Sequence, residues 1–531
     1  MMMVSKIFSL LQFFTLFTIT FASTEEATPL LKWKSTFKNQ NNSLLASWQP
    51  SSDACSDWYG VTCINGKVNT LNITNASVFA TLYDFPFSSL PFLEYHNLSM
   101  NNLSGTIPPE IGNLTNLVCL DLNTNQISEI PSTVCSLENL LILDLSRNNL
   151  KGAIPQCLGN MLRLEVLDMQ HNNLSGTFKS TFSIGNCYLT SFNFYGNKLE
   201  GRIPRSLANC QRLEVVDLGD NLLNDTFPMW LGTLPELQVL SLRSNKLHGP
   251  IRTSRFIKNL FPKLQIIDLA SNAFTGELPV NLFQNLGAMK RVNQTLNESS
   301  NTGDGYYHDS VTLVTKGQEH EVVSILSLYT AVDFSSNRFE GHIPGIRGDL
   351  IALRVLNLSH NKLEGHIPPS LGNLPSVESF DLSSNHLEGK IPEQLTSLTF
   401  LQFLNLSHNQ LHGCIPTGHQ FATFESNSYT GNDGLRGFPV LEGCGRSGLP
   451  ETNNPTHVLD QDSNSTFLSE FDWKVVLTGY ACGLSIGFSI AYFMLSSRNL
   501  NWLSRIAEEL QNKIIMRRRK KQRRRQRHNR R

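Results

Sequence analysis

The sequence predicts an α/β-type solenoid of leucine-rich repeats: a right-handed superhelix with a parallel β-sheet on its concave face, followed by a single transmembrane helix. Three observations lead to this fold class. A leucine pattern recurs about every 24 residues, one uncharged run is long enough to cross a bilayer, and a strongly basic segment follows that run. The 531 residues therefore form zones of different physical character rather than a series of ordinary globular domains.

The repeat has the form L-x-L-x-x-N-x-L-x-G-x-I-P, as in LDLSRNNLKGAIP (143–155) and LNLSHNKLEGHIP (356–368). A degenerate first copy begins at LNITNA (71–76), with Ala76 at the asparagine position, which makes thirteen repeats in all. The asparagine of the other copies stands at Asn101, Asn125, Asn148, Asn172, Asn197, Asn221, Asn245, Asn272, Asn337, Asn361, Asn385 and Asn409.

Each part of the repeat has a physical role. The alternating leucines place one face of a short strand in the core, and stacked strands form the parallel sheet. We expect the asparagine amide to bond backbone groups of neighbouring coils that would otherwise be buried without partners. Glycine and proline supply the positive φ and the fixed φ that bend the opposite wall. These residues are therefore structural, although a recurring polar residue invites a functional interpretation.

Two apolar segments indicate secretion and a membrane anchor. Ile7 to Phe21 follows Lys6, is too short to span a bilayer and precedes small residues, so we expect a cleaved signal peptide. Val475 to Leu495 is an uncharged run of 21 residues and predicts the transmembrane helix.

The charge distribution predicts the orientation in the membrane. Residues 496–531 contain 14 Lys and Arg against two Glu, which places this tail in the cytoplasm of a single-pass, type I membrane protein with an extracellular N-terminus. The expected ectodomain keeps 29 basic and 42 acidic residues, a net charge of −13. Behind a membrane span, the basic tail meets anionic lipid first, so we expect contact with the membrane and no nucleic-acid partner.

A solenoid exposes its core at both ends and needs caps, and the repeat spacing widens to 65 residues between Asn272 and Asn337. The extra residues form an island whose Tyr306, Tyr307 and VTLVT (311–315) predict that part of it packs on the solenoid. The predicted segments are a signal peptide 1–22, an N-terminal cap 23–66, repeats 67–290, the island 291–330, four repeats 331–413, a C-terminal cap 414–450, an acidic juxtamembrane stretch 451–474, the transmembrane helix 475–495 and the basic tail 496–531.

The G-x-I-P form resembles the plant-specific class of leucine-rich repeat. From STEEATPLLKWKSTFKNQNNSLLASW through DTFPMWLGTLPEL, YYHDSVTLVTKG and FESNSYTGNDGLRG to NKIIMRRRKKQRRRQR, the chain resembles the tomato leaf-mould (Cf) resistance receptor-like proteins. The resemblance implies a plasma-membrane immune receptor that senses an extracellular protein or peptide from a pathogen. It also implies signalling through an adaptor leucine-rich-repeat receptor-like kinase and a co-receptor kinase. The array before the island is shorter than is usual for these receptors.

Three other functions stay open: a developmental co-receptor, an inhibitor of cell-wall-degrading enzymes, and a non-signalling decoy. The transmembrane run argues against the inhibitor. We expect no enzyme, because the sequence contains no phosphate-binding glycine loop, kinase motif set or nucleophile elbow. We also expect no cofactor and no metal site, since His360 and His408 would lie two coils, or about 10 Å, apart.

Disulfides are expected at both caps. The resemblance to the N-terminal caps of plant repeat receptors pairs Cys55 with Cys63. In the C-terminal cap, Cys414 and Cys444 can pair. Cys187 and Cys210 lie about one repeat apart and can join adjacent coils, whereas Cys119, Cys135 and Cys157 have no partner by phase and are interpreted as buried thiols.

Candidate ligand contacts are outward positions of the concave strands that change from coil to coil, together with the two tyrosines of the island. These residues are Gln170, His171, Tyr195, Asp220, Arg243, Tyr306 and Tyr307. The last repeats are uniform, and the resemblance implies co-receptor docking there, through His360, Ser407 and His408.

Glycine recurs every four residues in the predicted span, at Gly479, Gly483 and Gly487. It forms a smooth stripe suited to contact with the span of an adaptor kinase. Candidate glycosylation sites are Asn41, Asn72, Asn75, Asn97, Asn102, Asn113, Asn173, Asn224, Asn293, Asn297 and Asn464. Asn357 and Asn405 also stand in sequons but lie within predicted strands, so we expect them to be unused or to mark a surface that no ligand needs.

Overall fold

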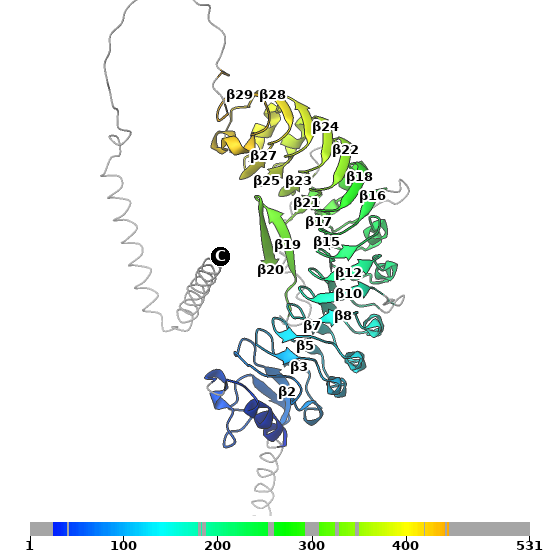
Figure 1. The fold of residues 1–531 in the computed structure, drawn as a ribbon, viewed down its shortest axis with the longest axis vertical. Coiled ribbons are helices and arrows are strands. Elements are labelled where there is room, and N and C mark those ends of the chain that lie inside the picture. Colours follow the sequence, from blue (N-terminus) through cyan, green and yellow to red (C-terminus); the bar gives the residue numbers. More distant parts are fainter. Residues whose placement is uncertain are drawn as a thin grey trace, which may run out of the picture. The chain divides into compact units, whose positions relative to one another are not determined.

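The repeats stack as coils, each of which adds one short strand to a long concave sheet (Figure 1). The chain divides into two units, Met1–Arg446 and Ser447–Arg531, and all described residues belong to the first. The computed structural model describes residues 25–39, 42–178, 182, 187–252, 260–291, 307–323, 329–345, 350–418, 420–440 and 443–444. The predicted signal peptide, juxtamembrane stretch, span and basic tail lie outside these residues, and no helix within them is long and apolar enough to cross a membrane.

The concave sheet has fourteen strands in sequence order, and all neighbours are parallel except the first pair. Thirteen of the strands, β2 to β27, come one from each repeat, which confirms the count of repeats. The strands are β1 (Val61–Ile64), β2 (Lys67–Asn72), β3 (Tyr95–Asn97), β5 (Cys119–Asp121), β7 (Ile142–Asp144), β9 (Val166–Asp168), β11 (Ser191–Asn193), β13 (Val215–Asp217), β15 (Val239–Ser241), β17 (Ile266–Asp268), β21 (Ala331–Asp333), β23 (Val355–Asn357), β25 (Ser379–Asp381) and β27 (Phe403–Asn405).

The asparagine of each repeat bonds two successive coils, as the sequence predicts. The Nδ2 of Asn385 donates to the carbonyls of Leu358, Leu382 and Ser383 at 3.1 to 3.2 Å, and its Oδ1 accepts from the amide of Leu363 at 3.0 Å. Leu358 and Leu363 belong to the preceding coil. A single buried amide therefore satisfies backbone groups where the chain leaves the sheet in both coils.

Shorter parallel sheets form where the coil bends after the asparagine. Their strands are β4 (Ser104–Gly105) with β6 (Gln126–Ile127); β8 (Lys151–Gly152), β10 (Asn173–Thr177), β12 (Lys198–Gly201) and β14 (Leu222–Leu223); and β16 (His248–Pro250), β18 (Ala273–Glu277), β22 (Arg338–His342), β24 (Lys362–His366), β26 (His386–Gly389), β28 (Gln410–Cys414) and β29 (Gly434–Arg436). The break between β14 and β16 coincides with Asp225, which stands where other repeats have glycine.

Glycine is required in these short strands for two reasons. Gly365 and Gly389 have φ of 74° and 83°, backbone angles that residues with a Cβ rarely adopt. In addition, a Cβ on Gly365 would lie 2.5 Å from Cδ2 of His342, and a Cβ on Gly389 would lie 2.3 Å from Cδ2 of His366. The x residue of one G-x-I-P therefore covers the glycine of the next coil.

The remaining wall consists mostly of short 3₁₀ helices, many of which begin just after the proline of the motif. They are η1 (Leu44–Ser47), η2 (Phe87–Ser89), η3 (Pro109–Asn113), η4 (Ser132–Ser136), η5 (Gln156–Asn160), η6 (Arg205–Asn209), η7 (Met229–Thr233), η8 (Gly287–Lys290), η9 (Pro369–Asn373), η10 (Glu393–Ser397), η11 (Gln420–Thr423) and η12 (Ser426–Ser428). Within the described residues, the α-helices are a first one over residues 25–35 and α2 (Val280–Asn285).

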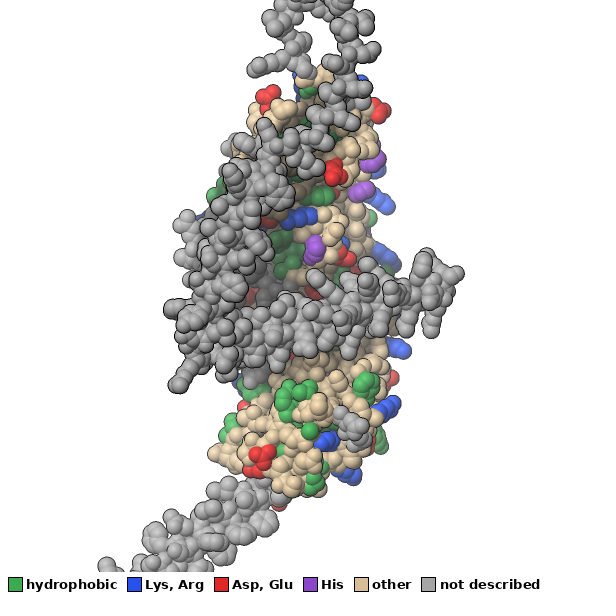
Figure 2. Space-filling model, turned by 90° about the vertical axis from the view of Figure 1, so that its left-hand side faces the viewer, with side chains coloured by type: hydrophobic (Ala, Val, Ile, Leu, Met, Phe, Trp, Pro, Cys, Tyr) green, Lys and Arg blue, Asp and Glu red, His purple; other side chains and the backbone are tan. Residues whose placement is uncertain are grey.

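The surface changes character along the stack (Figure 2). Large apolar side chains are exposed near the N-terminal end, among them Tyr83, Ile64 and Met100. The coils after the island instead expose histidines, such as His360 and His408.

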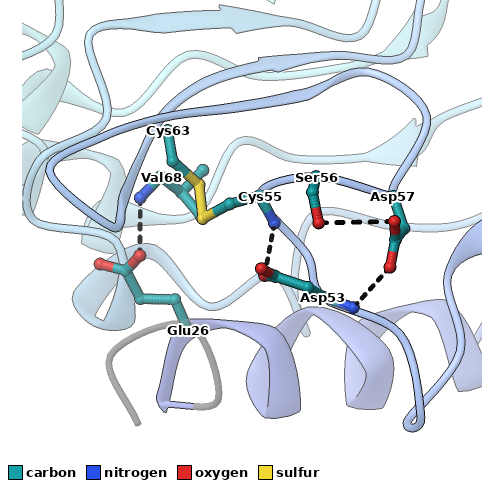
Figure 3. Close-up of a disulfide and its surroundings, with 7 residues drawn as sticks. All are labelled: Glu26, Asp53, Cys55, Ser56, Asp57, Cys63 and Val68. Carbon is teal, nitrogen blue, oxygen red and sulfur yellow. Dashed lines mark hydrogen bonds between the residues drawn. A yellow bond between two sulfur atoms is a disulfide. The ribbon is translucent and has the colours of Figure 1, made fainter. Parts of the chain in front are cut away.

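The N-terminal cap closes the first coil with a helix and a disulfide (Figure 3). Cys55 and Cys63 are bonded, and Glu26 of the first helix accepts a hydrogen bond at 2.7 Å from the amide of Val68 in β2. The edge of the sheet is thereby tied to the cap. At the other end, Cys414 and Cys444 form the expected second bridge.

The prediction of buried thiols was wrong for two cysteines. Cys135 of η4 and Cys157 of η5 form a disulfide between adjacent coils, as Cys187 and Cys210 also do. The first pair is 22 residues apart and so falls out of phase with the 24-residue repeat, but the two Cα atoms lie 5.9 Å apart, because successive helical segments stack. Cys119 is a buried free thiol.

His96 is a polar residue in a leucine position of the core. It lies in the middle of β3, is fully buried, and stacks on Phe85 at 4.7 Å between ring centroids. Among the described residues, neither ring nitrogen has a hydrogen-bond partner. Burial lowers the pKa of His96 to about 3.

We predict that replacing Asn385 with Ala lowers the free energy of unfolding by at least about 2 kcal/mol, because buried backbone groups of two coils lose their partner. Chemical denaturation of the variant measures this loss. The matched control is Asn373→Ala, at an exposed position, where the change should stay within about 0.5 kcal/mol. Equal effects at the two positions would refute the bridging role.

We predict that His96→Leu makes the protein less sensitive to acid. Since the folded pKa lies below the unfolded value near 6.5, the unfolded state binds the proton first. Stability is then lost as pH falls below about 6.5, by about 1.4 kcal/mol per pH unit until about 3. Denaturation midpoints at pH 6.5 and 4.5 should converge in the variant relative to the parent protein. A parallel pH profile in both proteins would contradict this assignment.

Candidate functional site

The concave face carries a β-hairpin that comes from the island. β19 (Ser310–Thr315) and β20 (Gln318–Val323) are antiparallel and pair with no other described strand. The VTLVT run supplies β-prone residues, and the turn at Lys316 and Gly317 has φ of 53° and 71°, as a tight hairpin turn requires. Figure 1 shows the hairpin on the concave side, running along the stack and across the strands. The structure thus confirms that part of the island packs on the solenoid.

One face of the hairpin is apolar. Val311 and Leu313 are buried, and with Val322 they pack against a row of residues at the beginning of the concave strands. This row consists of Val215, Val239, Ile266, Ala331 and Val355. Because these positions belong to coils on both sides of the island, the hairpin connects the two blocks of repeats.

The other face of the hairpin is polar and meets residues that follow the strands. Glu321 forms an ion pair with Arg147, and Oε1 of Glu319 lies 3.2 Å from Nη1 of Arg243. Between these pairs, Thr312 is hydrogen-bonded to the hydroxyl of Tyr195. The hairpin therefore stands between an apolar row and a polar row of the sheet.

The segment that leads into β19 is held by buried polar contacts. The Tyr307 hydroxyl donates to Oδ2 of Asp168 at 3.0 Å, and its ring packs on Cys119, Ile142 and Val166. The Ser191 hydroxyl donates to Asp309. Burial is the main cause that raises the pKa of Tyr307 well above its usual range. Tyr307, a predicted ligand contact, is thus engaged within the chain, and Tyr306 lies outside the described residues.

The far end of the hairpin reaches the last repeats. The backbone amide of Lys316 donates to the Ser379 hydroxyl at 3.2 Å, and its Nζ donates to Gln402 at 2.6 Å. The described hairpin therefore extends from the coil of β7, through Arg147, to the coil of β27.

The predicted ligand contacts fall into two groups. Gln170, Tyr195 and Arg243 are buried, and Gln170 donates to the Ser310 hydroxyl at 3.0 Å. His171 is half-buried and Asp220 is exposed. Sequence reasoning identified the variable concave positions but not their intramolecular partners. The E-x-E of β20, opposite two arginines of the repeats, was a signal that could have suggested them.

A row of buried carboxyl groups lies at the ends of three successive concave strands. Asp121, Asp144 and Asp168 are direct neighbours in successive strands, and each accepts the amide two residues further on through Oδ1. Burial, followed by the charge of Asp144, raises the pKa of Asp121 to about 7. Burial also raises the pKa of Asp144 and that of Asp168. These aspartates shape the strand ends, and no cluster of three potential metal-ligating residues occurs in the described part of the chain.

The candidate co-receptor contacts differ in exposure. His360 and His408 are exposed at the same position of two coils. Ser407 is buried, and its hydroxyl donates to Oδ1 of Asn405 at 2.7 Å. The two histidines are thus the accessible members of this set.

The predicted glycan sites also differ. Asn72, Asn75, Asn113 and Asn224 are exposed, whereas Asn102 and Asn173 are half-buried. Asn97 shares the strand position of Asn357 and Asn405, and its Nδ2 donates to Oδ2 of Asp121 at 2.8 Å. Asn97 therefore belongs with Asn357 and Asn405, the two sequons that the sequence analysis separated from the other candidates because they lie within strands. Asn41, Asn293, Asn297 and Asn464 lie outside the described residues, as do Gly479, Gly483 and Gly487.

A polar pocket of about 530 Å³ lies where the short sheet is interrupted between β14 and β16. Its charged lining residues are Glu200, Arg202, Asp225, Lys246 and His248. The sequence signal for it is the Asp225 that replaces the glycine of the repeat.

Family models match the chain at both ends of the array. The leucine rich repeat N-terminal domain matches residues 23–64, and the leucine-rich repeat region matches residues 86–185. Leucine rich repeat models match residues 188–210, 330–387 and 351–411.

Similar proteins are plant receptor-like proteins. The chain is 54% identical over 259 residues to receptor-like protein Cf-9 of Solanum pimpinellifolium, which covers 48% of this chain and 30% of Cf-9. It is 41% identical over 448 residues to receptor-like protein 53 of Arabidopsis thaliana, which covers 81% of this chain and 44% of that protein. The chain spans less than half the length of these relatives.

Among solved structures, the PEPR1–AtPEP1 complex superposes with a TM-score of 0.60 at 31% identity, covering 74% of this chain and 49% of that one. The fold and the matches together define a plant leucine-rich-repeat protein of the receptor-like class. Within that class, the chain is related to Cf-9 and to the Arabidopsis receptor-like proteins.

We predict that Asp144→Asn reduces the dependence of stability on pH. A folded pKa of about 7 for Asp121, against an unfolded value near 3.8, means that stability present in acid is lost as pH rises through 7. Removing the charge of Asp144 lowers the pKa of Asp121. Asparagine already stands at this position in β3, β11, β23 and β27, so the fold tolerates it.

Denaturation midpoints at pH 5 and 8 measure this effect. The difference between the two midpoints should shrink in Asp144→Asn and remain unchanged in Asp220→Asn, an exposed control on a neighbouring part of the face. An unchanged difference in the first variant would show that Asp144 does not affect Asp121.

Proposed function

We propose that this chain is a cell-surface receptor-like protein of plant immunity that senses an extracellular pathogen-derived protein or peptide and signals through associated kinases. The observation that carries the proposal is the concave face: side chains that differ from coil to coil surround a hairpin, on a chain 54% identical to Cf-9 over 259 residues. A surface of this kind offers an individual pattern of shape and charge to one ligand.

The ligand surface that we propose is composite. Gln170, Tyr195 and Arg243 contribute by holding the hairpin, while His171 and Asp220 remain accessible beside it.

Signalling is proposed to require two kinase partners. A co-receptor kinase docks on the last repeats through His360 and His408, which are exposed on coils two apart. An adaptor leucine-rich-repeat receptor-like kinase contacts the proposed membrane span, residues 475–495, along Gly479, Gly483 and Gly487. The span makes the chain a type I plasma-membrane protein, and the basic tail lies against the inner leaflet.

We predict that co-expression of the full-length chain with candidate receptor kinases in leaf tissue gives cell death after challenge with apoplastic fluid from infected plants. His360→Ala with His408→Ala should reduce co-receptor co-precipitation and leave ligand binding intact. Replacement of the three span glycines with Leu should instead reduce adaptor co-precipitation at equal surface expression.

Each result separates one alternative. Constitutive complexes without any response would replace the receptor proposal with a decoy. Responses that need no fluid from infected tissue would favour a developmental co-receptor. Loss of ligand binding with recruitment intact in the histidine variant would overturn the docking assignment. Unchanged adaptor co-precipitation in the glycine variant would overturn the proposed span contact.

A further inference from the structure

The outer edge of β20, on the side away from β19, is the more exposed edge of the hairpin. Glu319, His320 and Glu321 are exposed, whereas all described positions of β19 are buried or half-buried. Among the described residues, no strand pairs with this edge. An exposed edge with free backbone groups is a template for a further strand.

The register shows which backbone groups are free. In a hairpin closed by a two-residue turn, the residues flanking the turn form a hydrogen-bonded pair, and bonded and non-bonded pairs then alternate. Thr315 faces Gln318 across the turn, and Leu313 faces His320 two residues further on. These are the bonded pairs, so the amide and carbonyl groups of Glu319 and Glu321 point away from β19.

The opposite edge of the hairpin is already occupied. The carbonyl of Ser310, which the same alternation turns outward from β19, accepts a hydrogen bond from Nδ2 of Asn193 in the sheet. The β19 edge is therefore set against the concave sheet. The apolar and polar faces of the hairpin are also covered, by the rows around Val239 and Arg243. Among the described residues, only the β20 edge of the hairpin has no partner.

We propose that the outer edge of β20 binds an extended, basic peptide segment of an extracellular partner by strand addition. The proposal deepens the receptor function and rests on it for the source of the peptide. The occupant follows from the charge of the hairpin: residues 307–323 contain three acidic side chains and one lysine, a net charge of −2, and two of these carboxylates remain partly exposed beside the arginines of the sheet that they pair with. Glu319 and Glu321 flank the edge, with side chains 56% and 39% exposed. Lysine or arginine at alternate positions of the added strand would lie beside them.

Hydrogen bonds to the two free residues would supply affinity, and the flanking carboxylates would supply selectivity. The ion pairs of Glu321 with Arg147 and of Glu319 with Arg243 fix β20 against the concave sheet. The edge is therefore ordered before the peptide binds. Preorganisation of this kind reduces the entropic cost of binding.

The test uses the full-length chain in detergent and a phage-displayed library of random dodecapeptides as the probe. Selected peptides should contain alternating Lys or Arg and should slow amide hydrogen exchange at Glu319 and Glu321. Exchange at His320, whose amide is bonded within the hairpin, should change less. Failure to select peptides, or protection confined to other residues, would overturn the proposal.

Proline variants separate backbone pairing from charge. Glu321→Pro removes only an outward amide, because proline is tolerated on an edge whose N–H faces solvent. Glu321→Ala loses the same side chain and keeps the amide. We expect the dissociation constant of the selected peptides to rise roughly tenfold more for Pro than for Ala.

Slow exchange at Leu313 and His320 in the proline variant verifies that the hairpin is still formed. If it is lost, Glu319→Pro provides the same comparison at the other free residue. Equal affinities for the Pro and Ala variants would overturn strand addition. The two proposals can fail separately, because this test measures binding only. If the protein binds the selected peptides but does not signal, the receptor function is wrong and strand addition stands. If the protein signals but binds no peptide at this edge, strand addition is wrong and the receptor function stands.

Discussion

The asparagine amide that bonds two coils at once is the interaction on which the rest of the structure depends. Each coil must turn from the concave strand into the bend, and this turn leaves backbone groups in a dry interior where water cannot reach them. The Nδ2 and Oδ1 atoms of residues such as Asn148 meet this need for their own coil and the coil before it. Since the same bond is repeated along the array, the spacing between coils stays uniform, and the strands remain in register.

The uniform spacing of the coils also has an electrostatic cost. It aligns the aspartates of successive repeats in a row, where burial raises the pKa of each and the charge of Asp144 raises the pKa of Asp121 and of Asp168 further. The row is tolerated because each carboxylate accepts the amide two residues on, and because asparagine interrupts it at Asn193 and Asn357. The Nδ2 of Asn357 donates to Asp333, which shows how an amide relieves its acidic neighbour.

The same scaffold positions the hairpin. The concave sheet has an apolar row at the beginning of its strands and a polar row after them. Side chains alternate along β19 and β20, so the hairpin has one apolar face that packs on the first row and one polar face that pairs with the second. The free concave surface is therefore narrower than a bare solenoid would offer. Recognition by this protein depends on the hairpin as much as on the coils, because the hairpin covers Gln170 and Arg243 and presents its own outer edge.

Much of this could be predicted from the sequence, because the repeat encodes local rules that act identically in every coil. The leucine core, the backbone bridges made by residues such as Asn385, and the packing of VTLVT on the solenoid follow from periodicity and residue chemistry. The Cys135–Cys157 bridge, the pairing of Glu319 with Arg243, and the burial of Tyr195 and Tyr307 do not. They join residues outside the phase of the repeat, and only the stacked and curved coils bring those residues together. The sequence by itself thus determined the solenoid and the kind of surface it carries, whereas the tertiary structure decided which part of that surface is open, because contacts between an island and distant coils leave no periodic trace in the chain.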